Sequence, residues 1–312
     1  IHALPMFNTG YADKDGNIFY VYNAKIPKRD DRYNWHELLA GDAQGNIWTS
    51  YVPFDSLPQV LNPKDGFLQN CNSNPYLATG DPDEVSKALP DWTGIETHQT
   101  NRAMRALETF GADSSITREE FFSYKYDTRY SLNSVIAKVR DRYIQDMANE
   151  TDQKLIFALS LIKGWNLSAD STNTAAALSM IVLPNAFNKA DLKYEPEIIT
   201  RKLVETIDYL ENKFGKIDVP LGQVLRLVRG ETNLPLSGGP GLLRAIYFEK
   251  KDDIYIGRAG DCYFQAVEWG PNGELNAWTI HQYGSATAIE SSVHYDDQAK
   301  LFSKHEMRQV RP

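Results

Sequence analysis

The stretch GFLQNCNSNPYLATGDP, residues 66–82, places four neutral amides close together: Gln69, Asn70, Asn72 and Asn74, with Asn62 just upstream. A surface turn needs only one or two residues of this kind. A fixed amide NH₂ is a neutral donor, so it can point at an oxygen on which negative charge develops during a reaction. Because Asn-rich loops are usually turns, the loop alone leaves an oxyanion hole and an ordinary turn both open.

An amide that serves as an oxyanion donor must be held in one orientation. Arginine suits that task because its planar guanidinium carries several donors in a rigid fork. The chain offers an arginine on the predicted helix TNRAMRALE, which begins at Thr100, 18 residues after the amide loop ends at Pro82. A surface salt bridge is the ordinary alternative for such an arginine.

Composition excludes several classes of function. The 312 residues are 42 % hydrophobic, which is enough for a sizeable core. The net charge is −8 without a basic patch, so the sequence predicts neither a nucleic-acid nor an anionic-membrane partner. Two Cys exclude a disulfide-rich scaffold and a thiolate zinc cluster. No run of about 18 apolar residues occurs, so no membrane span is expected.

The chain is organised as one β-rich segment, one mostly helical segment and a second β-rich segment. We expect the boundaries at residues 1–82, 83–216 and 217–312, all within a single domain over 1–312. Strands at the two ends of a chain with a helical insertion usually meet in one sheet. The order of the segments therefore predicts an α+β fold in which both ends of the chain contribute strands to one sheet.

Local signals support these segments. Asp15-Gly16-Asn17 precedes the strand-like run IFYVY, which predicts a hairpin; the alternative, a calcium loop using Asp13 and Asp15, has its Gly at the wrong position. The segment GDAQGNIWTSYV predicts a turn followed by a strand. Thr117 with Glu120 forms a capping-box pattern. The stretch PEIITRKLVETIDYLENKFG, residues 196–215, predicts a helix with Pro196 in its first turn and Gly215 at its end.

Other catalytic motifs are missing from the sequence. The six His make no H-x-x-x-H or H-E-x-x-H pair, which argues against a catalytic metal. The Gly-rich run SGGPG, residues 237–241, lacks the ending of a phosphate loop and predicts a tight turn. No G-x-S-x-G elbow is present. Catalysis by a pair of carboxylates is neither supported nor excluded, because the sequence alone does not show which Asp and Glu lie close together.

The residues resemble one family over nearly the whole chain. YADKDGNIFY, NPKDGFLQNCNSNP, TNRAMRALE, VPLGQVLRLVRGETNLPLSGGPG and the closing HYDDQ block are similar, in order, to the penicillin acylase family of N-terminal nucleophile hydrolases. The helical middle, 150–215, matches least. The pattern is closer to acylases of aliphatic amides and acyl-homoserine lactones than to the phenylacetyl type.

The resemblance implies a fold and a mechanism. The fold is the αββα sandwich of antiparallel sheets, here with a helical insertion. In the family a precursor cuts itself, and a Ser exposed at the new N-terminus attacks a linear acyl amide. Carried over by motif, Asn72 is the side-chain oxyanion donor and Arg102 fixes it, while Asn70 and Cys71 flank the substrate. Cys71 stands where some relatives have Trp. No cofactor is required.

The departures from the family pattern indicate a fragment. Ile1 has no hydroxyl, and the family's Ser and backbone oxyanion donor lie upstream of the matching region. We therefore expect this chain to be the C-terminal part of the large subunit, inert alone, with the N-terminal portion and small subunit of the same precursor as partners. Cys262 stands where Ser is common, and we expect a buried small side chain. For calcium, which some relatives bind, only Asp83 lies near a ligand position.

Two other functions compete with the acylase. A glycan-binding module would stack sugars on Trp35, Trp48 and Trp92, although Trp48 in an alternating run is more simply a core residue. A pseudoenzyme of the same family would lack the upstream Ser. The family's usual location is the periplasm or the exterior of the cell, and its members act in antibiotic metabolism.

Overall fold

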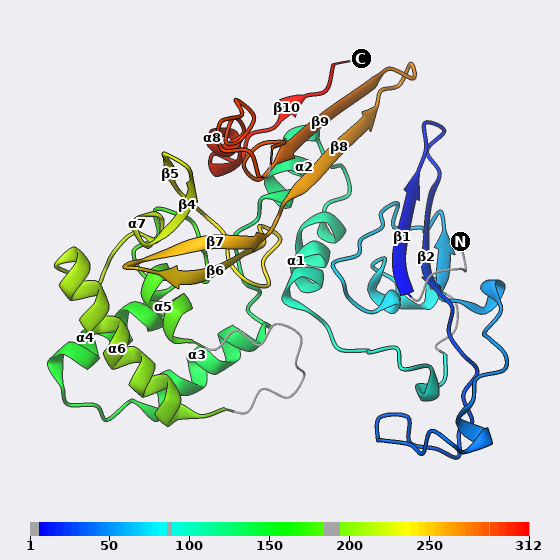
Figure 1. The fold of residues 1–312 in the computed structure, drawn as a ribbon, viewed down its shortest axis with the longest axis horizontal. Helices are drawn as coiled ribbons and strands as arrows, with labels where there is room; N and C mark the ends of the chain where they lie inside the picture. Colours follow the sequence, from blue (N-terminus) through cyan, green and yellow to red (C-terminus); the bar gives the residue numbers. More distant parts are fainter. Residues whose placement is uncertain (1–5, 86–88, 184–193, 287, 312) are drawn as a thin grey trace. The chain divides into compact units, whose positions relative to one another are not determined.

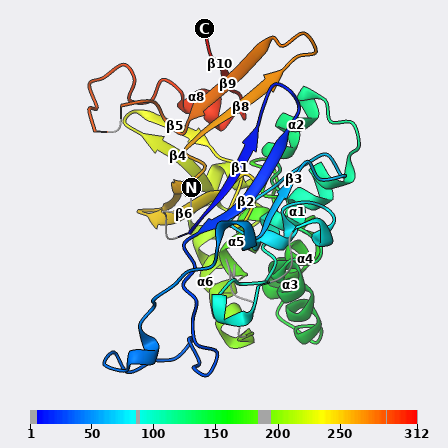
Figure 2. The same cartoon turned by 90° about the vertical axis from the view of Figure 1, so that its right-hand side faces the viewer.

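The structure is a computed structural model that describes residues 6–85, 89–183, 194–286 and 288–311. The chain divides into two compact units, residues 1–116 and residues 117–312. Figures 1 and 2 show their elements from two directions. Each unit is described by itself below.

A three-stranded antiparallel sheet forms the centre of the first unit. Its strands are β1 (Met6–Ala12), β2 (Ile18–Ala24) and β3 (Gln59–Leu61), in the order β1-β2-β3. They lie side by side in Figure 2. The predicted hairpin between β1 and β2 is confirmed, and its turn places Gly16 at φ 85°, a conformation that glycine adopts without strain.

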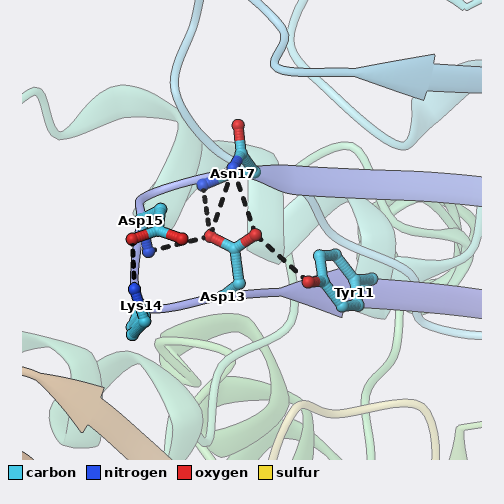
Figure 3. A network of polar contacts seen from close by, with 5 residues as sticks. All are labelled: Tyr11, Asp13, Lys14, Asp15 and Asn17. Carbon is cyan, nitrogen blue, oxygen red and sulfur yellow. Dashed lines mark hydrogen bonds and ion pairs between the residues drawn. The ribbon is translucent and has the colours of Figure 1, made fainter.

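The side chain of Asp13 closes this hairpin from within (Figure 3). Its Oδ1 accepts hydrogen bonds from the backbone N–H groups of Asp15 and Asn17, both at 2.9 Å, and Tyr11 Oη donates to its Oδ2 at 3.1 Å. These bonds, led by those from Asn17, lower the pKa of the Asp13 carboxyl. Both oxygens of Asp13 thus accept hydrogen bonds within the hairpin.

The central strand β2 buries residues on both sides of the sheet. Tyr20 packs in a cluster with Val60, whereas Val21 packs in a second cluster with Val52. Successive strand residues face opposite sides, so the two clusters cover the two faces. The loops after β2 and β3 therefore pack on the sheet that they leave.

The rest of the first unit is loop with short helices. The 3₁₀ turns are η1 (Gln44–Asn46), η2 (Phe54–Ser56), η3 (Pro75–Leu77), η4 (Pro82–Glu84), η5 (Asp91–Thr93) and η6 (Phe110–Ala112), and the one longer helix is α1 (Asn101–Thr109). The strand expected in NIWTSYV is wrong: η1 occupies its start, and only Tyr51 makes a bridge, to Pro27. Trp48 is 50 % exposed, so the core position expected for it is also wrong.

Helices dominate the first half of the second unit. They are α2 (Arg118–Lys125), α3 (Val135–Asp146), α4 (Gln153–Gly164), α5 (Ala176–Val182), α6 (Pro196–Phe214) and α7 (Leu221–Val224), coloured green to yellow-green in Figure 1. The capping box of Thr117 and the Gly215 end of α6 are confirmed. Leu203, Ile207 and Leu210 of α6 are fully buried at helical spacing in the large core of this unit.

Two small sheets complete the second unit. One has the order β5-β4-β7-β6 and the other β10-β9-β8. Their elements are β4 (Leu225–Arg229), β5 (Thr232–Pro235), β6 (Ile246–Lys251), β7 (Ile254–Gly260), β8 (Tyr263–Trp269), β9 (Leu275–His281), α8 (Ala299–Ser303) and β10 (Arg308–Gln309). All pairs are antiparallel except β4 with β7, which is parallel. The turn expected in SGGPG is confirmed, with Gly238 and Gly241 at positive φ.

The chain is thus α+β, as expected, with one correction. Within the first unit β1 to β3 pair with one another. The expectation that strands from both ends of the chain share one sheet stays a prediction. Cys262, expected to be buried, is exposed between β7 and β8. Within the described residues no helix combines the length and apolarity that crossing a membrane requires.

Candidate active site

The amide-rich loop follows β3, and its side chains bond the loop to itself. Gln69 Nε2 donates to the carbonyl of Leu77, and the Gln69 backbone N–H donates to the Ala78 carbonyl at 2.8 Å. Asn70 Oδ1 accepts the backbone N–H of Asn72 at 3.0 Å, and Asn70 Nδ2 donates to the Ser73 carbonyl at 3.3 Å. Such side-chain bonds replace the backbone pairing that a loop lacks. They explain most of the amides without a catalytic role.

Asn74 attaches this loop to the segment before α1. It is 7 % exposed, and its Nδ2 donates to the carbonyls of Thr97 at 3.1 Å and His98 at 3.3 Å. Its Oδ1 accepts the N–H of Tyr76 at 3.0 Å and so caps η3. All polar atoms of this buried amide therefore point into the protein. Asn74 brings the loop next to the start of α1.

Helix α1 begins where Thr100 caps it. Thr100 Oγ1 accepts the N–H of Ala103 at 3.2 Å, and Ala103 and Ala106 are buried against the unit. This face fixes the rotation of the helix, which leaves Arg102 in its first turn on the side of the amide loop.

Arg102 and Asn72 meet across the gap between helix and loop. Arg102 Nη2 donates to Asn72 Oδ1 at 2.9 Å. The arginine thus bonds the amide oxygen of Asn72 and, having donors alone, does not bond its Nδ2. Asn72 itself stands at φ 56°, a left-handed conformation that Asn tolerates better than most residues. Its side chain is exposed, whereas the neighbouring Ser73 and Asn74 are buried.

Asn72 lines a cavity of about 360 Å³. The other lining residues come from β1, β2, the amide loop and the segment before α1: Met6, Asn8, Tyr22, Ser73, Asn74, Gly94, Ile95, Glu96 and His98. Arg102, Asn70 and Cys71 are not among them. Asn70 and half-buried Cys71 precede Asn72 in the same loop. Of the four predicted site residues, the structure therefore brings Asn72 to the cavity and Arg102 to Asn72.

The opposite wall of the cavity was not expected from the sequence. Asn8 of β1 lies directly across from Tyr22 of β2, and Asn8 Oδ1 accepts the hydroxyl of Tyr20. Burial, followed by the charge of Glu96, raises the pKa of the Tyr22 hydroxyl. His98 Nδ1 lies 3.6 Å from Glu96 Oε2. The Asp-Gly-Asn turn sets the hairpin register, so the facing pair Asn8 and Tyr22 could have been read from it.

The described residues do not assemble a metal site. None of them forms a group of three or more His, Cys, Asp or Glu that could hold an ion. The N–H of Asp83, the residue considered for calcium, donates to Asp81 Oδ1 at 3.0 Å within η4. The carboxylate of Asp83 has no such cluster around it.

Comparison with known proteins gives consistent results. The family model described as penicillin amidase matches residues 1–311. Penicillin G acylase of Escherichia coli is 34 % identical over 68 residues, 22 % of this chain and 8 % of that protein. The penicillin acylase 2 proenzyme of Pseudomonas sp. (strain SE83) is 22 % identical over 116 residues, 37 % of this chain and 14 % of that protein.

A solved structure supports the fold. A thermostable penicillin G acylase from Alcaligenes faecalis matches with a TM-score of 0.56 and 16 % identity, over 97 % of this chain and 64 % of that chain. At this identity the likeness shows the fold alone, and it confirms the expected fold class. The matched segments span only part of each of these proteins.

Proposed function

Because this chain belongs to the penicillin amidase family, we propose that the complete protein is an amidohydrolase that cleaves linear acyl amides. The substrate is an amide such as a penicillin or an acyl-homoserine lactone. This chain supplies the oxyanion donor Asn72 and the positioning residue Arg102. The observation that carries the proposal is the 2.9 Å bond from Arg102 Nη2 to Asn72 Oδ1 beside a cavity.

The proposed reaction uses a Ser at the N-terminus of a processed precursor, supplied from outside residues 1–312. Its Oγ attacks the amide carbonyl carbon while its α-amino group takes the hydroxyl proton through a water. The carbonyl oxygen becomes negative and accepts hydrogen bonds from Asn72 Nδ2 and a backbone N–H. Collapse expels the amine with a proton, and water then hydrolyses the ester to release the acid.

The chemistry explains why Asn and Arg are both needed. Asn72 brings donors without a titratable proton, so it acts equally over a wide pH range. An unrestrained amide could present its oxygen to the oxyanion, which would repel it. Arg102 prevents that rotation because a guanidinium has only donors and bonds only the oxygen. Asn70 holds the Asn72 backbone, and we assign it and Cys71 a supporting place around the substrate.

The remaining features of the proposal follow from the family. The partners are the N-terminal portion and small subunit of the same precursor, the zymogen is activated by cleavage, and the location is the periplasm or the outside of the cell. No cofactor is part of the mechanism.

The test uses the gene product from its natural start. Its intact mass and the N-terminal sequence of each chain after expression should give two chains, the larger beginning with Ser. Amine release is then measured on a panel of acyl amides with Asn72→Ala, and with Asn272→Ala in the β8–β9 turn as the control. We expect Asn72→Ala to lower kcat by about 100- to 1,000-fold and the control to leave it unchanged.

Either of two results would contradict the proposal. A single unprocessed chain without amidase activity would leave a pseudoenzyme. An active protein in which Asn72→Ala retains wild-type kcat would remove Asn72 from the mechanism.

A further inference from the structure

The first unit contains a second cavity, of about 490 Å³, that the proposed reaction does not use. Three aromatic side chains line it, Tyr33, Trp35 and Trp92, together with polar residues that include Arg29, Asp31 and Asp91. It shares Gly94 and Glu96 with the Asn72 cavity, but Asn72 does not line it. The volume suits a small molecule or one ring of a larger one.

Arg29 fixes the aromatic walls. Its Nη1 donates to the Trp92 carbonyl at 2.8 Å, and its guanidinium carbon lies 5.7 Å from the ring centre of Trp35 and 5.5 Å from that of Trp48. Trp35 in turn donates its Nε1 hydrogen to the Asp30 carbonyl at 2.8 Å. Arg29 thus contacts the rings of Trp35 and Trp48, both in the connection between β2 and β3, and the main chain of Trp92 in η5. The rings of Trp35 and Trp48 are therefore held on this cation without a ligand.

Gly94 permits this arrangement. Its φ is +73°, and a Cβ built there would lie 3.3 Å from Arg29 Nη1. A side chain at residue 94 would therefore be strained and would press on the arginine that holds the rings.

The side chains that line the cavity include both positive and negative charges, and some of their carboxylates accept no hydrogen bond within the described residues. In the part of the chain that the structure describes, the carboxylates of Asp31 and Asp91 accept no hydrogen bond, and neighbouring Asp30 is the partner of Arg32 instead. Arg29 Nε is buried without a partner among the described residues, so it is closed off from the cavity itself. The cavity therefore offers the carboxylate oxygens of Asp31 and Asp91 to a ligand, beside the positive charge of Arg29.

A charged ligand fits this cavity poorly. A cation would be repelled by Arg29, and an anion would be repelled by Asp31, Asp91 and Glu96. A hydroxyl group both donates and accepts, so it can bond carboxylates and a guanidinium together. A sugar ring carries such hydroxyls around its edge and C–H groups on its faces, which stack on aromatic rings. We propose that this cavity binds a neutral sugar ring, through Tyr33, Trp35 and Trp92 as walls and Asp31 and Asp91 as hydroxyl acceptors.

Saturation-transfer NMR on the complete protein tests the site. The probes are the methyl glycosides of glucose, galactose, mannose and N-acetylglucosamine, with cadaverine and acetate as charged probes. We expect at least one glycoside to bind saturably in the millimolar range and the charged probes to bind more weakly. Asp31→Asn, a surface change that preserves shape, should weaken that glycoside about fivefold or more, and Trp35→Ala should abolish its binding.

Trp269→Ala is the matched control, because it removes an exposed tryptophan of β8 in the other unit. It should leave the affinity unchanged. The proposal is overturned by no saturable binding of any of the four glycosides, by tighter binding of a charged probe, or by a loss in Trp269→Ala equal to that in Asp31→Asn. None of these binding measurements requires amide hydrolysis, so their outcome does not depend on the proposed reaction.

Discussion

Two arginines, one in each unit, show how surroundings decide what the same side chain does. Arg102 makes its bond to Asn72 where the partner is exposed to solvent. Arg244 is 0 % exposed: its Nη2 donates to the Phe302 carbonyl at 2.7 Å, its Nη1 lies 3.4 Å from Asp261 Oδ2, and its guanidinium covers the Phe302 ring at 3.8 Å. An exposed bond contributes little to folding, whereas a buried cation must be matched. We expect Arg102 to govern chemistry and Arg244 to govern stability.

The surroundings of Arg244 hold further titratable groups. Lys125 Nζ lies 3.1 Å from Asp261 Oδ2, so this carboxylate serves two cations. The His305 ring stacks on Tyr126 at 4.9 Å, and the guanidinium of Arg244 lies 5.4 Å from the Tyr126 ring centre. In the described residues, Tyr126 Oη, Arg244 Nε and His305 Nε2 are buried without a partner. The cluster is therefore sensitive to any change in charge.

The largest effect should come from Asn72→Asp. The aspartate keeps an oxygen for Arg102, so the loop is preserved, but it replaces the donor by an acceptor facing the oxyanion. We expect kcat to fall about 1,000-fold with the melting temperature unchanged. Amine-release kinetics and calorimetry on the complete protein check both. A retained kcat would show that the side-chain donor is not Asn72.

On the other side of the comparison, Asp261→Asn leaves the buried Arg244 without its carboxylate. We expect the free energy of unfolding to fall by about 3 kcal/mol. Denaturant titration measures it, with Glu249→Gln as control, because the Glu249–Arg258 pair is exposed and should contribute under about 0.5 kcal/mol. Equal effects of the two variants would contradict the distinction between buried and exposed pairs.

The same cluster should make stability depend on pH. Burial, then the charge of Arg244, lowers the pKa of His305 to about 4, against an ordinary value near 6.5. Between these values the unfolded chain binds the extra proton and the folded chain does not. His305 should therefore leave stability unaffected above about pH 7 and lower the free energy of unfolding by about 3 kcal/mol on acidification to about pH 4. Below that pH this group should cause no further loss.

Variants separate His305 from the other groups that titrate. His305→Asn, which suits the positive φ of this position, should remove that share of the slope between about pH 7 and pH 4. His294→Gln, on an exposed ring, should retain it. Urea titrations across this range decide the matter, and an unchanged slope in His305→Asn would refute the assignment.

The smallest effect should come from Arg102→Ala. Asn72 then keeps its donors but can rotate its oxygen toward the oxyanion. We expect a loss of about tenfold in kcat, with little change in KM and in the free energy of unfolding. A loss confined to KM would indicate that Arg102 acts on substrate binding instead.

The sequence predicted the elements that depend on local signals. The Asp-Gly-Asn hairpin, the Thr117 capping box and the ends of α6 all follow from residues within a few positions of one another. Asn72 and Arg102 were selected together by resemblance, and they lie in contact. What local patterns missed depends on packing between distant segments.

Three misses share that cause. Trp48 follows an alternating pattern, but Arg29 holds it at a half-exposed position away from any core. Asn74 resembles its neighbouring amides, yet its Nδ2 bonds the segment before α1. Cys262 lies in a short connection between two hairpins, where no layer covers it. None of these contacts leaves a period or a motif in the sequence.

The most direct test of the central claim is a double-mutant cycle on kcat with Asn72→Ala, Arg102→Ala and the combined variant of the complete protein. If Arg102 acts only by orienting the Asn72 amide, the combined variant should be as slow as Asn72→Ala alone. If the two losses multiply, Arg102 acts independently of Asn72, and the account of this site is wrong.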